Sequence, residues 1–127
     1  MINFGLGSPS TATWKLDQSF KGWLQSIYTW FKCLSTPVIK TAAYTFDNST
    51  FFVAANVTSS GFTITLPLAA DNPGRQVSVK KIDASGNTLT VGRSGSDLID
   101  GATTVTTTTQ YASWTFISDG ISNWWII

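Results

Sequence analysis

Histidine is absent from this 127-residue sequence, and cysteine occurs once, as Cys33. Histidine is the most common general base and metal ligand, and one cysteine cannot form an intrachain disulfide or supply a zinc site. These absences exclude Ser-His and Cys-His nucleophile pairs and a disulfide framework. Because Cys33 lies among aromatic residues, we expect its thiol to be buried and inert.

Glutamate is also absent, and only 12% of the residues are charged, with a formal net charge of +1. Such a balance does not indicate nucleic-acid binding, which needs a strongly basic surface. All the acids are aspartates, which favour turns and caps over helix interiors, so a mainly β protein is indicated. The sequence also lacks an apolar run of about 18 residues, the length of a transmembrane helix.

The remaining polar motifs give almost no support for an enzyme. Asp97 and Asp100 could form a carboxylate pair for glycoside hydrolysis, but they flank Leu98-Ile99 as turn residues would. The glycine-rich residues 92–95 lack the lysine and helix of a phosphate loop, and Lys80-Lys81 is expected to be solvated. We therefore predict a protein with no catalytic residues, cofactor or metal.

An amphipathic helix is predicted over residues 13–34. Its apolar residues are spaced by 4, 3, 4, 3 and 4 positions, which is typical of one helix face. A proline at position 37 ends it, and the preceding residues 1–12 read as an extended arm. We predict that this helix binds a partner through Trp14, Leu16, Phe20, Trp23, Ile27, Trp30, Phe31 and Leu34.

From residue 43 onward, short alternating strands and turn signals predict a small β-sandwich or jelly-roll-like barrel. In one strand Phe62, Ile64 and Leu66 share a face, and residues 85–87 read as a hairpin connection into the strand at Leu89. The predicted organisation is an N-terminal arm and helix over residues 1–36, a linker over 37–42 and a β domain over 43–127.

The sequence ends on two tryptophans and two isoleucines. Read as a strand, Trp124 and Ile126 point to one face, and Trp125 and Ile127 point to the other. One face can fill the core, and the other needs a second cover that a neighbouring subunit would supply. We therefore predict that Trp124, Trp125, Ile126 and Ile127 form an oligomer interface.

Several stretches follow one another in an order that resembles a known family. They are Tyr44-Thr45-Phe46, FTITLPLA from Phe62, NPGRQVSVKKID from Asn72, GNTLTV from Gly86, LIDGATT from Leu98, QYASWTFISDG from Gln110 and the final NWWII. This series resembles the small β-rich C-terminal domain of bacteriophage and prophage tail-fibre or head-fibre proteins. The resemblance implies a virion structural module, usually trimeric, at the outer end of a fibre, without shared catalytic residues.

Three hypotheses about function remain open. The first is a trimeric fibre or decoration protein on the outer surface of a capsid or tail, anchored by its N-terminal segment. The second is a tip that binds a receptor or a host-cell glycan through residues 56–61 or 92–97. The third is a membrane-interacting protein that uses the aromatic helix, which carries only Lys15, Lys21 and Lys32 to attract anionic lipid.

The same helix allows three arrangements. Its 4-3 spacing fits a three-helix bundle in a trimer, although bulky tryptophans are awkward in a tight seam. Docking into a groove of a capsid or tail protein is the second arrangement. The third is a helix that simply packs against its own β domain.

Overall fold

A computed structural model describes residues 18–127, except for the side chains of residues 28–35. The chain divides into two compact units, residues 1–31 and 32–127. The described chain begins with helix α1 (Gln18–Ser35), which occupies most of the stretch where the apolar spacing predicts a helix. The chain leaves the helix at Thr36-Pro37, and the second unit is built from strands.

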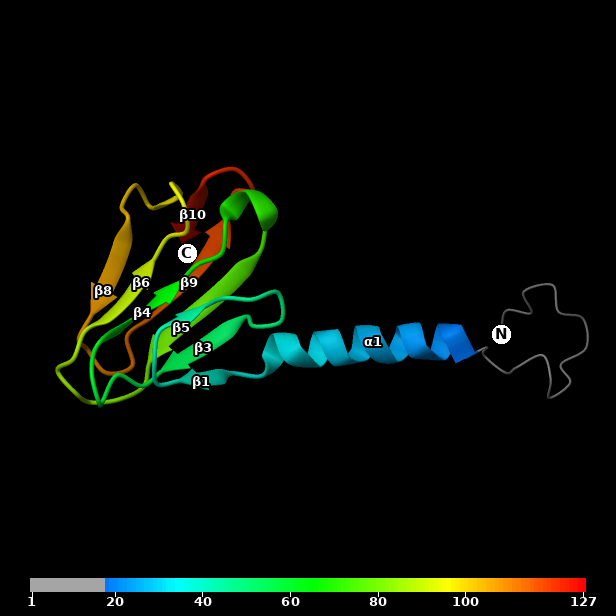
Figure 1. The fold of residues 1–127 in the computed structure, drawn as a ribbon, viewed down its shortest axis with the longest axis horizontal. Helices are drawn as coiled ribbons and strands as arrows, with labels where there is room; N and C mark the ends of the chain where they lie inside the picture. The colour runs from blue at the N-terminus through cyan, green and yellow to red at the C-terminus, as the bar shows by residue number, and fades with distance from the viewer. Residues whose placement is uncertain (1–17) are drawn as a thin grey trace, which may run out of the picture. The chain divides into compact units, whose positions relative to one another are not determined.

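The strands of the second unit form two sheets, which confirms a mainly β protein (Figure 1). A six-stranded sheet has the order β1-β3-β5-β9-β10-β7, and a four-stranded sheet has the order β2-β4-β6-β8. The strands are β1 (Val38–Lys40), β2 (Tyr44–Thr45), β3 (Phe52–Ala55), β4 (Phe62–Thr65), β5 (Gln76–Lys81), β6 (Leu89–Gly92), β7 (Leu98–Ile99), β8 (Thr104–Thr107), β9 (Ser113–Ser118) and β10 (Asn123–Ile126). A short 3₁₀ turn, η2 (Ala69–Asp71), lies between β4 and β5.

The strand pairing differs from the antiparallel hairpins of a jelly roll. Strands β1, β3 and β5 are parallel neighbours in one sheet, and β2, β4 and β6 are parallel neighbours in the other. The predicted hairpin at residues 85–87 is wrong, because β5 and β6 lie in different sheets. Successive strands therefore alternate between the two sheets from β1 to β9. The antiparallel pairs are β6 with β8, β5 with β9, and β9 with β10.

The predicted linker at residues 37–42 contains a strand of the fold. Within it, β1 pairs in parallel with β3, with Val38 opposite Val53 and Lys40 opposite Ala55. The β-branched residues Val38 and Ile39 favour an extended backbone, which is the local reason for this strand. The first strand of the fold thus lies within the predicted linker and starts five residues before residue 43.

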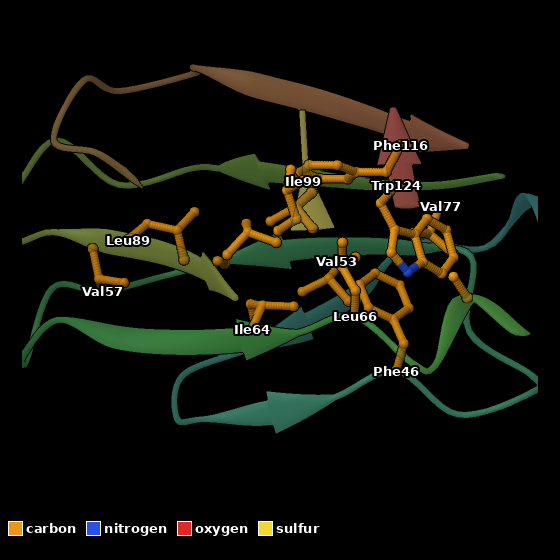
Figure 2. Packing of buried hydrophobic residues seen from close by; sticks show 14 residues of the cluster. Phe46, Val53, Val57, Ile64, Leu66, Val77, Leu89, Ile99, Phe116 and Trp124 are labelled. Carbon is orange, nitrogen blue, oxygen red and sulfur yellow. The ribbon is translucent and has the colours of Figure 1, made fainter. Parts of the chain in front are cut away.

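One hydrophobic core lies between the two sheets. Figure 2 shows Val53, Phe116 and Trp124 from the six-stranded sheet facing Ile64 of the four-stranded sheet and Leu66, just beyond its strand β4. Both Ile64 and Leu66 are buried, and Phe62 packs against the core, so the face predicted for this strand is confirmed. This core fixes which side of each strand points inward and which side remains on the surface.

Candidate interaction surfaces

Helix α1 exposes aromatic and aliphatic side chains. The exposed fractions are 42% for Phe20, 57% for Trp23 and 41% for Leu24, whereas Ile27 is half-buried. The rings of Phe20 and Trp23 stack with their centroids 5.7 Å apart, as residues three positions apart on a helix can. Exposed apolar residues gathered on one helix are typical of a surface that binds a partner.

The structure does not describe the side chains of the other predicted binding residues of the helix. Trp14 and Leu16 lie outside the described residues, as do the side chains of Trp30, Phe31, Cys33 and Leu34. Partner binding by the helix therefore stays a prediction, now carried by Phe20, Trp23 and Leu24. Leu24 is not among the residues that the apolar spacing predicted for partner binding.

Strand β10 divides its side chains between the core and the surface, as its alternation predicts. Trp124 is fully buried, and its indole N–H donates a hydrogen bond of 3.1 Å to the carbonyl of Pro67. Ile126 packs against the core. Trp125 is 45% exposed and Ile127 is 67% exposed. Of the four predicted interface residues, Trp124 and Ile126 therefore belong to the core side of the strand, and Trp125 and Ile127 lie on the surface.

The turn before β10 is held by Asp119. Its carboxylate accepts hydrogen bonds from the N–H groups of Ile121, Ser122 and Asn123, and from the Asn123 side chain at 2.8 Å. The Asn123 side chain and these N–H groups lower the pKa of Asp119 to about 2. Gly120 has a φ of +77°, which an L side chain rarely adopts. These contacts set the direction in which the final strand starts.

We expect Gly120→Ala to lower the free energy of unfolding by about 2 kcal/mol, because it forces alanine into the left-handed region. A Cβ at this position would also lie 2.8 Å from the Cβ of Pro73. Urea denaturation measures the difference. Gly86→Ala is the matched control, since its Cβ meets no atom within 4 Å. Equal midpoints for the two variants would contradict this account of the turn.

The side of the six-stranded sheet that faces away from the core carries a second apolar surface. We call this surface, made of Ile39, Phe52, Ala54, Ile117, Trp125 and Ile127, the outer face. Strand register brings these residues together: Trp125 lies opposite Ile117, and Ile39 lies opposite Ala54. A row of paired residues also crosses the sheet from Ile127 to Phe52. The Ile127 N–H donates to the carbonyl of Thr115 on β9. Thr115 lies opposite Ser78 on β5, and Ser78 lies opposite Phe52 on β3.

The chemistry of the outer face suits contact with another protein surface. Between its apolar residues lie neutral side chains, such as Ser78 and Thr115, whose hydroxyl oxygens are 2.9 Å apart. Among the outward-facing residues of β1, β3, β5, β9 and β10, one is charged, and it is Lys80. Parallel strands are usually covered on both faces, and here β1, β3 and β5 have the core on one face only.

The two aspartates considered as a catalytic pair have structural contacts. Asp97 is buried, and its carboxylate accepts a hydrogen bond of 2.7 Å from the N–H of Ala69. Asp100 adopts a φ of 47°, and its carboxylate accepts one of 3.2 Å from the N–H of Ile126. Each carboxylate thus joins its own loop to a segment distant in the sequence.

The expectation that Lys80-Lys81 is solvated is wrong for Lys81, which is fully buried. Alternation along β5 points Lys81 inward after Val77 and Val79, and the lysine finds its partner two residues later. Its ammonium group lies 2.9 Å from the Asp83 carboxylate and also donates to the carbonyls of Asp83 and Ser85. The sequence signal for the Lys81–Asp83 ion pair is that the inward-facing alternation of β5 ends on Lys81 and that Asp83 follows two positions later.

The predicted tip loops lie at opposite ends of the strands. The chain enters the β unit at β1, and the parallel strands β3 and β5 run in the same direction. Residues 56–61, 82–88 and 108–112 therefore gather at the far end, which we call the distal end. Residues 92–97 follow β6 and lie at the end where the chain enters. Only residues 56–61 can belong to a tip remote from the helix connection.

The described residues contain neither a metal-binding cluster nor a membrane-spanning helix. Among the side chains of residues 18–27 and 36–127, no group of three or more His, Cys, Asp or Glu residues is placed to hold a metal ion. The one described helix is not long and apolar enough to span a membrane.

Comparison of the sequence with protein-family models and with curated proteins finds no match.

Proposed function

We propose that this protein is a non-enzymatic structural protein of a bacteriophage virion. In this proposal it forms a short trimeric fibre or decoration on the outer surface of a capsid or tail, with the β domain exposed. The virion assignment is supported by the ordered sequence stretches that resemble fibre domains. The single observation that carries the assembly role is that one chain exposes apolar side chains both on helix α1 and, at Ile39, Trp125 and Ile127, on the outer face.

The two surfaces have separate tasks in the proposal. Helix α1 attaches to a capsid or tail protein through Phe20, Trp23 and Leu24, which are exposed. The outer face packs against neighbouring copies of the chain. Lys80 is the one charged residue among the outward positions of β1, β3, β5, β9 and β10, so like-charge repulsion between copies is small. Burying Trp125 and Ile127 removes apolar area from water.

The attachment role is tested with particles that lack this protein and are mixed with purified variants. We expect Phe20→Ser combined with Trp23→Ser to abolish co-sedimentation with particles, because the stacked aromatic pair is lost. Lys21→Ser combined with Gln25→Ser is the matched control, since it changes two exposed polar residues of the same helix. Equal co-sedimentation of both double variants would rule out attachment through this helix face.

Membrane binding by α1 is the competing use of the same residues. An interfacial helix needs cationic residues on its polar face to bind anionic lipid, and Lys21 is the one among residues 18–27. Flotation with anionic vesicles separates the two uses. The proposal expects no flotation at physiological salt.

A further inference from the structure

The distal end contains an exposed aromatic residue in a backbone conformation that favours glycine. Tyr111 has a φ of +65°, and 61% of its side chain is exposed. Its N–H donates to the carbonyl of Lys81, and the N–H of Lys81 donates to the carbonyl of Ala112. Tyr111 and Ala112 thus oppose one residue of β5, which makes a β-bulge whose first residue is left-handed, a position that glycine usually occupies.

Tyrosine at this position has no packing role that would explain it. A left-handed non-glycine residue costs on the order of 1–3 kcal/mol, and most of this side chain is in water rather than in the core. Its ring contact is with Lys80, whose ammonium group lies 5.5 Å from the ring centroid and donates to the Tyr111 carbonyl. Departures from local backbone preferences of this kind are expected at functional or strained sites.

The loops around Tyr111 are held firmly in place. Asp83 accepts hydrogen bonds from the buried Lys81 and from the N–H of Val57, which joins residues 82–88 to residues 56–61. The Asn87 side chain donates to the carbonyls of Val57 and Thr58. The Gln110 side chain donates to the carbonyl of Ile82. Tyr111 therefore projects from a preorganised platform rather than from a loose loop.

The chemistry of the distal loops is neutral and rich in hydroxyl and amide groups. Residues 56–61, 82–88 and 108–112 contain one charged residue, Asp83, which is buried, and Lys80 at the end of β5 adds a single cation beside the Tyr111 ring. Exposed Thr58, Ser59 and Ser60 lie in the first of these loops. An aromatic face beside neutral hydrogen-bonding groups matches a saccharide, which offers an apolar C–H face and a rim of hydroxyls. The lack of a cationic cluster disfavours phosphate-bearing ligands.

We propose that the distal end binds a neutral saccharide that stacks on the ring of Tyr111. The neighbouring neutral side chains of residues 56–61 and 108–112 hydrogen-bond its hydroxyl groups. This site uses one chain only, so it does not depend on the trimer or on attachment to a virion. It gives the exposed end a recognition role in addition to the structural one.

The test uses the full chain and a panel of glucose, galactose, N-acetylglucosamine and their disaccharides, followed by NMR of the backbone amides. At least one sugar is expected to shift amides of residues 108–112 and 56–61. Tyr111→Gly is expected to weaken that binding at least about tenfold, the loss of one strong contact, and at the same time to raise the melting temperature. Tyr111→Phe should retain binding within a few-fold.

Three results would overturn the proposal. They are the absence of amide shifts with every sugar of the panel, unchanged binding by Tyr111→Gly, and a lower melting temperature of Tyr111→Gly than of the native chain. The last result would mean that the tyrosine serves the fold rather than a ligand.

Discussion

Lys81→Met is expected to lower the free energy of unfolding by about 3–5 kcal/mol, the usual effect of removing one partner from a buried ion pair. The substitution leaves the Asp83 carboxylate buried without the ammonium group that lies 2.9 Å from it. It also removes the donor to the carbonyls of Asp83 and Ser85. Chemical denaturation followed by tryptophan fluorescence measures the change.

Lys80→Met is the matched control, because Lys80 is the preceding residue on the same strand and points to the outer face. Its ammonium group donates one exposed hydrogen bond, to the carbonyl of Tyr111, and has no buried ion-pair partner, so we expect a change below about 1 kcal/mol. Equal destabilisation by the two substitutions would contradict a buried Lys81–Asp83 ion pair.

The same pair predicts a pH dependence. Burial raises the pKa of Asp83, but hydrogen bonds from Lys81, Ser85 and Val57 outweigh it and hold that pKa well below its ordinary value. A depressed carboxyl pKa adds stability that is complete above the unfolded pKa of about 4 and is lost as the pH falls through the folded value. The native chain should therefore lose stability below about pH 4, and its difference from Lys81→Met should narrow there.

The second large effect is a loss of stability on replacing Trp124, which we do not expect on replacing its neighbour Trp125. Trp124→Ser is expected to cost about 3–5 kcal/mol or more, because it leaves a cavity in the core where the indole is fully buried. It also removes the donor to the Pro67 carbonyl. Thermal denaturation should show a chain that is largely unfolded or melts far below the native one.

Trp125→Ser is expected to leave the β domain folded and to dissociate the assembly. The side chain of Trp125 is 45% exposed in one chain, opposite Ile117 on the outer face. Circular dichroism should remain that of the native chain, while mass measurement should shift from trimer to monomer. A folded trimer of Trp125→Ser would place the subunit contact elsewhere.

Local patterns predicted the type of structure better than its pairing. Turn signals and alternation were enough to indicate a mainly β chain and to place Phe62, Ile64 and Leu66 on one shared face, which lies against the core. Pairing was missed because parallel neighbours are far apart in sequence, as with Val53 and Val79 in β3 and β5. No short-range pattern encodes such a contact, whereas a hairpin reading of residues 85–87 needs only local turn residues.

The candidate sites show the same division. Alternation in the last four residues correctly placed Trp124 and Trp125 on opposite faces, but it did not indicate which of the two is buried in the core. The buried Lys81 was missed because a lysine pair is usually solvated, and its burial depends on Asp83 and on loops that meet only in the fold. Tyr111 was missed because its left-handed backbone has no glycine or asparagine to signal it.

The central claim is that copies of this chain assemble through the outer face, and its most direct test is the mass of the native chain in solution. Analytical ultracentrifugation at micromolar concentration should give a trimer of about 41 kDa, three times the 13.7 kDa chain. The mass should fall to that of one chain with Trp125→Ser. A native chain that sediments as a 13.7 kDa monomer at this concentration would contradict the account.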